Sequence, residues 1–156
     1  MNNIDIANGM VFNALDIKND TFENRVISQK RIYLFQSLGL NLGYSFVWYI
    51  HGPYSPELTS YMYENIAIFR NYDFSKYSMN KKACDYIDKV NSLSAAKIPE
   101  MSEAEWYELL SSIVYVQEKK NSACTYEQLK KVKPQFNEDE YSKATNVLKS
   151  MGFISG

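Results

Sequence analysis

Histidine and cysteine, which commonly act in acid–base and nucleophilic catalysis and bind zinc, are scarce in this chain of 156 residues. His51 is the single histidine, and Cys84 and Cys124 are the two cysteines. A structural zinc site needs four ligands that are usually Cys or His, and these three residues are too few to supply them. The chain contains none of the motifs of phosphate-binding loops, dinucleotide-binding folds, zinc proteases or serine hydrolases. We therefore expect no metal, no cofactor and no enzymatic activity.

Each of these three residues also has a simple structural interpretation. Cys84 lies on the apolar stripe of an expected helix, which favours a buried and inert thiol, whereas Cys124 precedes a helix start and is expected to be exposed. A histidine beside a Gly-Pro turn more often bonds to the backbone than transfers protons, and we prefer this interpretation for His51. The enzymatic alternative is a Cys–His pair, because such residues meet in space and not in sequence.

The segment HGPYSP, residues 51–56, predicts a rigid corner between a strand and a helix. The preceding residues 44–50, YSFVWYI, alternate and are rich in aromatic side chains, which favours a short strand. Gly52 and Ser55 each precede a proline, so extended backbone is favoured at both positions. Ser55 is then placed to cap a helix over roughly 56–69 that has proline at its first position.

The rest of the chain predicts helices joined by short turns. Apolar residues surround most of a helix expected over 22–38, which predicts a central helix packed on several sides. Asp20 and Glu23 resemble a capping box at its start. Further helices are expected over residues 3–15, from about Ala83 to Leu93, and over 102–119, 125–132 and 137–150. The final GFIS sequence is interpreted as one strand of a wing.

These elements predict a mainly α fold, namely a compact helical domain with winged-helix-like halves and one or two short strands. The absence of flexible linkers favours a single domain over residues 1–156. Its N-terminal half spans 1–93, its C-terminal half spans 101–156, and the joint lies near 94–101.

The charge balance disfavours nucleic acid as the main partner, because the net charge is -1 and nucleic-acid-binding domains usually carry a basic surplus. The three helices of the C-terminal half nevertheless follow the order of a winged helix-turn-helix. A DNA-binding regulator is therefore the alternative, with Lys130, Lys131 and Lys133 touching phosphates. Residues 138–140 are all acidic and begin the helix that would enter the groove. A solvated lysine face is the ordinary interpretation.

No feature of the sequence indicates export or a membrane. The first residues are neither basic nor continuously apolar, and no apolar run reaches the length of a membrane span. Two cysteines are too few for a disulfide framework, so reduced thiols are expected. We expect a cytoplasmic protein with no membrane partner.

Aromatic residues are in surplus, with 13 Tyr, 8 Phe and 2 Trp. Tyrosine suits half-buried positions and interfaces. Trp48 and Tyr49 face opposite sides of the expected strand, so both cannot enter the same core. One face either packs under the C-terminal half or stays exposed as a binding patch, which Arg25 and Gln29 on the central helix would border. Packing between the two halves is the alternative for all of these residues.

Two motifs at a defined spacing resemble a known family. The first is the run QKRIYLFQ from Gln29 to Gln36, and the second is FxWYxxGPYSxxL from Phe46 to Leu58. Over about residues 20–70 the chain resembles the YwgA-like family of bacterial proteins. It more distantly resembles the Panacea (SocA-like) antitoxin domain, in which a Q-K-x-x-Y helix precedes a G-P corner.

This resemblance implies a winged-helix-like helical fold and a non-enzymatic role, since Panacea-type domains are associated with neutralising toxins by direct contact. The positions that match the family pattern are Gln29, Gly52, Pro53, Tyr54 and Ser55. We therefore expect the partner to be another protein, such as a toxin or a component of a bacterial defence system. It would bind these residues together with the patch of Arg25, Trp48 and Tyr49.

Overall fold

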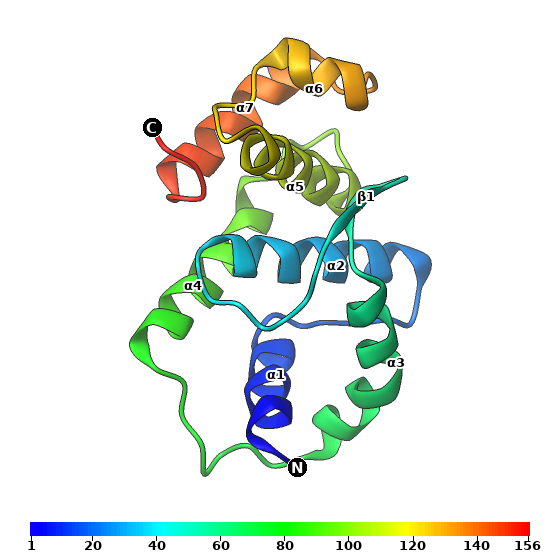
Figure 1. Ribbon diagram of the computed structural model, residues 1–156, viewed down its shortest axis with the longest axis vertical. Coiled ribbons are helices and arrows are strands. Elements are labelled where there is room, and N and C mark those ends of the chain that lie inside the picture. Colours follow the sequence, from blue (N-terminus) through cyan, green and yellow to red (C-terminus); the bar gives the residue numbers. More distant parts are fainter.

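The computed structural model describes residues 1–156 and contains seven α-helices, one short 3-10 helix and one β-hairpin (Figure 1). The helices are α1 (Asn3–Ala14), α2 (Phe22–Ser37), α3 (Pro56–Asn71), α4 (Lys81–Ser92), α5 (Glu103–Lys120), α6 (Tyr126–Val132) and α7 (Glu138–Ser150). The strands are β1 (Val47–Tyr49) and β2 (Gly52–Tyr54), and the 3-10 helix η1 (Leu93–Ala96) directly follows α4. The predicted mainly helical fold with a short sheet is confirmed. No helix combines the length and the apolar character that crossing a membrane requires.

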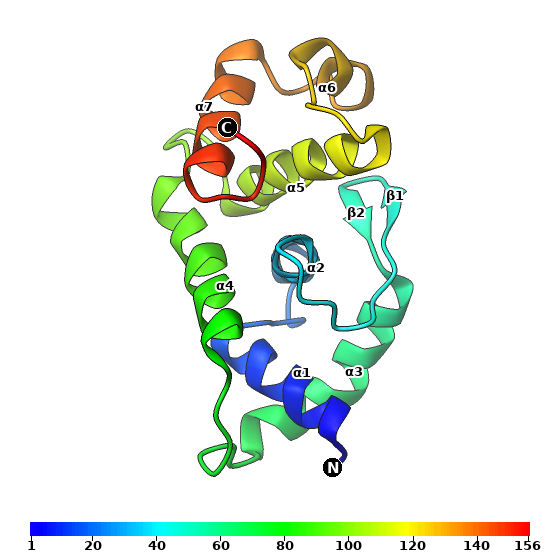
Figure 2. The ribbon, with the colours of Figure 1, turned by 60° about the vertical axis from the view of Figure 1, so that its left-hand side comes forward.

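Helix α2 is the centre of the fold, as its nearly continuous apolar circumference predicts. Figure 2 views it along its axis, with α1, α3, α4, α5 and the hairpin arranged around it. The eight consecutive residues 28–35 are all buried. They include Gln29, Lys30 and Arg31, whose polar groups must find partners inside the protein. These three side chains bond to segments that are distant in sequence, so α2 also ties its neighbours together.

One hydrophobic core of 31 buried residues runs through the molecule. Helices α1 and α3 lie toward the end that holds the N-terminus, and α5, α6 and α7 lie toward the end that holds the C-terminus (Figure 1). The largest fully buried side chains include Phe12 near the first end, Phe35 in α2 and Trp106 in α5. The indole N–H of Trp106 donates to the carbonyl of Leu93, so this large ring is buried without an unpaired donor.

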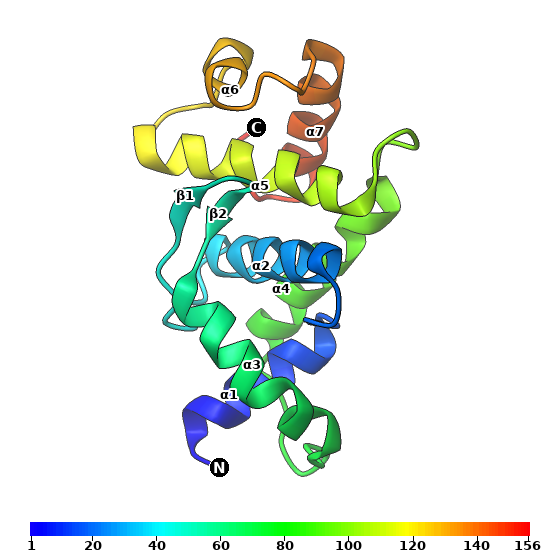
Figure 3. The same cartoon turned by 90° about the vertical axis from the view of Figure 1, so that its right-hand side faces the viewer.

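The sheet is a two-stranded antiparallel hairpin, with Val47 opposite Tyr54 and Trp48 opposite Pro53. The strand expected over 44–50 is therefore shorter, and the predicted corner itself contributes the second strand. Gly52, which begins β2, has φ +95°, a value that favours glycine because it has no Cβ. Figure 3 shows that the hairpin lies against α5.

Side-chain caps fix the starts of most helices where the sequence predicts them. The side chains of the N-cap residues accept backbone N–H groups at four predicted positions, namely Ser55, Ser102, Thr125 and Asn137. The capping box of Asp20 and Glu23 is wrong. Thr21 caps α2 by accepting from the backbone N–H of Asn24, and the Asp20 carboxylate instead accepts from the Asn24 side chain. Two adjacent residues could both cap this helix, and the backbone conformation selected the second.

The C-terminal half contains the expected three helices but no wing. Residues 153–155 form no strand, and Phe153 and Ile154 are buried in the core. The expectation of a strand after α7 is therefore wrong. The pattern of two apolar residues after a glycine does not distinguish a strand from a turn whose side chains cover the end of a helix bundle.

Candidate protein-binding site

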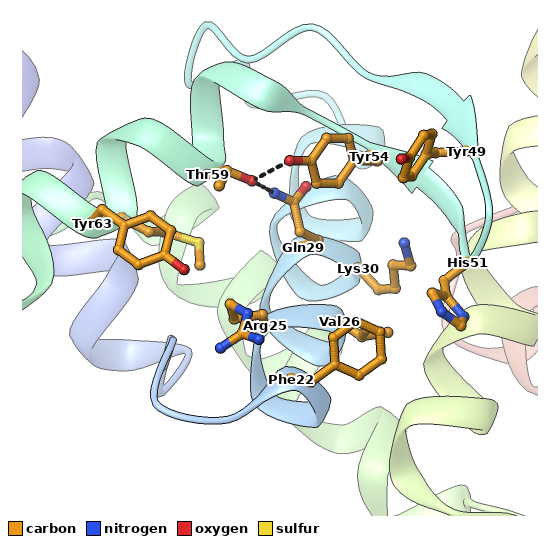
Figure 4. A pocket seen from close by; sticks show the side chains of 11 residues that line it. Phe22, Arg25, Val26, Gln29, Lys30, Tyr49, His51, Tyr54, Thr59 and Tyr63 are labelled. Atoms are coloured by element: carbon orange, nitrogen blue, oxygen red, sulfur yellow. Dashed lines mark hydrogen bonds between the residues drawn. The ribbon is translucent and has the colours of Figure 1, made fainter.

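A surface recess of about 300 Å³ opens between α2, the hairpin and α3 (Figure 4). Its volume is at the lower end of the range for ligand pockets. The lining consists of Phe22, Arg25, Val26, Gln29 and Lys30 from α2, Tyr49, His51 and Tyr54 from the hairpin, and Thr59, Met62 and Tyr63 from α3. The helical residues recur at spacings of three and four, which place them on one face of each helix.

A buried clamp between α2 and the corner positions the hairpin. The Gln29 amide donates to the carbonyl of Ser55 at 3.0 Å and to Thr59 Oγ1 at 2.8 Å. Its carbonyl accepts the backbone N–H of Ser55 at 2.9 Å. Thr59 in turn donates to the Tyr54 hydroxyl at 2.9 Å. Gln29 and Ser55 are both buried, so the two motifs found in the sequence meet here as a structural joint.

Lys30 reinforces the same joint from the interior. Its ammonium group donates to the carbonyl of Pro53 at 2.7 Å, and the residue is 2% exposed. Burial lowers the pKa of Lys30 to about 7, against the attraction of Glu108 and with the repulsion of Lys133. A lysine at this position was not among the predicted site residues. The sequence feature that could have indicated Lys30 is a charged residue within the otherwise apolar stretch of α2.

Glu108 of α5 is the centre of a charged cluster beneath the hairpin turn. Its Oε2 lies 3.0 Å from Lys133 Nζ and accepts from the Gln135 side chain, and its Oε1 lies 3.1 Å from His51 Nδ1. The Lys133 ammonium also donates to the carbonyl of Ile50 at 2.6 Å. The interpretation of His51 as bonded to backbone is therefore wrong, because its partner is a carboxylate supplied by a distant helix.

The lysines proposed for DNA binding do not form one surface. Lys130 and Lys131 are exposed, whereas Lys133 is buried and bonded to Glu108. Its placement as a phosphate-contacting residue is wrong, because the ammonium group is turned inward beneath Trp48, 5.2 Å from the centroid of that ring. The exposed first turn of α7 carries Glu138 and Asp139. No strand follows α7 to complete a wing.

The two sides of the hairpin have different environments. Trp48 points toward α5, where its ring lies 5.3 Å from that of Tyr115, so this side packs between the two halves of the chain. Tyr49 points the other way and lies 5.3 Å from the ring of Tyr54. Val47 shares the side of Tyr49, because alternate residues of a strand face the same way. One side of the strand thus packs under the C-terminal half, and the other side stays exposed.

Five large apolar side chains gather around and beside the recess, and we call them the apolar rim. They are between 51% and 69% exposed, and they are Phe22, Val47, Tyr49, Ile50 and Tyr63. Phe22 is tied to the hairpin by an edge contact with His51, at 5.4 Å between ring centroids. Of these five, only Tyr49 is among the predicted site residues. Exposure was the missing information, since apolar residues in a strand or helix normally predict burial.

The predicted site residues therefore divide into two groups. Arg25, Tyr49 and Tyr54 line the recess together with Gln29. Gly52, Pro53 and Ser55 are buried behind it and hold the backbone, and Trp48 packs against α5.

The two cysteines are placed opposite to expectation, with Cys84 exposed and Cys124 buried. The inward side of α4 is formed by Ala83, Ile87 and Val90, and Cys84 is turned away from it. Cys124 enters the core beside α5, and burial raises the pKa of its thiol to about 11. The expectation that Cys124 is exposed is therefore wrong. No group of three or more metal-ligating side chains gathers anywhere in the chain.

We predict that a thiol reagent labels Cys84 of the native protein at the rate of an ordinary exposed thiol. Cys124 should react at least about 100-fold more slowly, because it is both buried and protonated near neutral pH. Mass spectrometry of the labelled peptides separates the two rates, and labelling in urea should make them converge. Rapid labelling of Cys124 in the native protein would contradict the prediction and reopen the cysteine-enzyme alternative.

Comparison of the chain with protein-family models, curated protein sequences and solved structures found no match. The site is therefore interpreted from its own geometry.

Proposed function

We propose that the protein is a non-enzymatic binding module that docks another protein on the surface formed by the recess and the apolar rim. The observation that carries this proposal is that three exposed apolar side chains, Phe22, Tyr49 and Tyr63, line one recess, while the other two rim residues continue along the hairpin. Soluble proteins rarely leave several large apolar side chains together in water, and such surfaces usually contact a partner. Tyr, Phe and Arg at the centre of a patch are also the residue types that dominate binding energy.

The support beneath the surface favours binding over catalysis. The Gln29–Ser55 clamp and the Lys30–Pro53 bond fix the hairpin against α2, so the rim is displayed by a rigid scaffold. A rigid surface loses little conformational entropy when a partner docks. The thiol of Cys124 is buried and lies outside the recess lining, so it does not face His51 there as a nucleophile. On the distant resemblance of its two motifs to the Panacea antitoxin domain, the partner we propose is a toxin or another component of a bacterial defence system.

The test is affinity capture from a lysate of the native host with the tagged protein and with the double variant Phe22→Ser/Tyr49→Ser. We expect the native protein to retain one partner protein in stoichiometric amount. The double variant should bind the purified partner at least about 30-fold more weakly, because each substitution removes a central aromatic contact. Circular dichroism and thermal unfolding establish that the variant is folded.

The matched control is Ile4→Ser. Ile4 is 67% exposed on α1 and lies outside the recess. This variant should retain the partner fully. Equal loss in both variants, or no loss in the rim variant, would refute the proposal, and retention of nucleic acid alone would favour the DNA-binding alternative.

A further inference from the structure

The polar groups that face the recess are nearly all hydrogen-bond donors. None of the eleven lining residues is Asp or Glu. Gln29 is saturated by the clamp, and Lys30 donates to Pro53 behind the surface. The Tyr54 hydroxyl is engaged with the Thr59 hydroxyl. The hydroxyl groups of Tyr49 and Tyr63 make no hydrogen bond within the protein, so both remain able to donate.

Arg25 is the free cation of this site. It forms no ion pair with any carboxylate of the chain. One of its Nη atoms donates to the carbonyl of Asn19, and its guanidinium group lies over the ring of Phe22, 5.8 Å from the centroid. The guanidinium has five N–H donors, so most of them are unpaired within the protein. Its planar fork matches a carboxylate, and its stacking on Phe22 holds it at the edge of the recess.

We propose that the recess binds a segment of a partner polypeptide in which a carboxylate side chain stands next to an aromatic or aliphatic side chain. The carboxylate pairs with Arg25, and the apolar side chain enters the recess over Met62 and Val26. This inference rests on the proposed function and specifies the chemistry of its partner.

The extent of the apolar rim selects a polypeptide over a small carboxylic acid. Phe22, Tyr49 and Tyr63 line the recess itself, whereas Val47 and Ile50 lie beyond its lining along the hairpin. A small acid that fills the recess leaves these two residues in water. A chain that continues along the hairpin covers them and gains their burial energy.

The probe is a phage-displayed library of short random peptides, panned on the native protein. We expect the selected peptides to place Asp or Glu within a few positions of an aromatic residue or Leu. Their binding should weaken about 10- to 100-fold with Arg25→Gln, because a charge-assisted hydrogen bond is removed. Lys81→Gln removes an exposed cation on α4 and is the matched control, which should bind as the native protein does.

A double-mutant cycle locates the contact. Replacing the acidic residue of a selected peptide with its amide should cost the same affinity as Arg25→Gln, and the two changes together should cost little more than either alone. Additive losses, selected peptides without acidic residues, or the failure of any peptide to be enriched would overturn the inference. If phenylacetate bound the recess as tightly as the selected peptides do, the recess would be a small-molecule pocket, and the inference would also be overturned.

These outcomes are separable from those of the proposed function. A partner that depends on Phe22 and Tyr49 but is indifferent to Arg25→Gln leaves the binding module in place and removes only the acidic-segment chemistry. The proposed function would instead be refuted if the partner bound equally well with and without the aromatic side chains of the apolar rim.

Discussion

Replacing Glu108 with glutamine is expected to lower the free energy of unfolding by about 3–5 kcal/mol. The Glu108 and Lys133 side chains are only 10% and 5% exposed, and their charged atoms lie 3.0 Å apart. Glu108 also attracts the buried Lys30. The amide keeps the size of the side chain but leaves the buried Lys133 ammonium group without a counterion, and an unpaired buried charge is far more costly than the pair is stabilising. Urea denaturation at pH 7 measures the change.

A second variant separates charge from packing. Adding Lys133→Met to Glu108→Gln should recover part of the lost stability, because the unpaired ammonium group is then absent. The matched control is Asp139→Asn, which breaks the exposed i,i+4 pair between Asp139 and Lys143. That change should cost less than about 1 kcal/mol. Similar losses from the buried and the exposed pair would contradict the role given to Glu108.

The stability of the native protein is expected to rise relative to a Lys30→Met variant as the pH increases from 7 toward 10. Burial holds the pKa of Lys30 at about 7, whereas a solvated lysine in the unfolded chain has a pKa of 10.5. Between these values the unfolded chain binds a proton that the native chain does not, so the free energy of unfolding increases with pH. Below pH 7 both states are protonated and the native state bears the full cost of the buried charge.

Relative to the variant, the free energy of unfolding of the native protein is expected to increase by about 1.4 kcal/mol for each pH unit between the two pKa values. The total increase is about 5 kcal/mol if this whole pH range is crossed. Urea denaturation between pH 6 and 9.5 measures it, since tyrosines begin to titrate above that range. The test compares only the slopes of the two curves of unfolding free energy against pH. The absolute stabilities are not compared, because the methionine substitution also leaves the Pro53 carbonyl without its hydrogen-bond donor. The control is Lys81→Met at an exposed lysine, whose curve should parallel that of the native protein. If the curve of the Lys30→Met variant also ran parallel to that of the native protein, the lowered pKa assigned to Lys30 would be refuted.

Local patterns predicted most of the helical architecture. The apolar circumference of residues 22–38 predicted a central helix, and α2 is central. The Ser-Pro pair at positions 55 and 56 predicted a helix start, and α3 starts there. These predictions succeeded because capping and helix burial depend on residues within one or two turns of each other.

Predictions that depended on which way a side chain points were less successful. Cys84 and Cys124 exchanged their expected environments, and Lys133 turned inward from a run of lysines that resembled a solvated face. For Cys84 on α4, a rotation of about one residue around the helix decides the outcome, and the apolar pattern does not fix it that closely. Cys124 and Lys133 lie just before and just after α6, where no helical period indicates which way a side chain points.

The sequence by itself determined the helical class, the helix starts and the two motifs that join α2 to the hairpin. Those features follow from interactions between neighbours in the chain, or from an apolar pattern that persists over several turns. Only the tertiary structure decided that Arg25, Tyr49 and Tyr63 meet around one recess, and that Glu108 pairs with Lys133 beneath it. Contacts between residues so far apart in the chain depend on how α2, α3 and α5 pack, and packing is a property of the whole core.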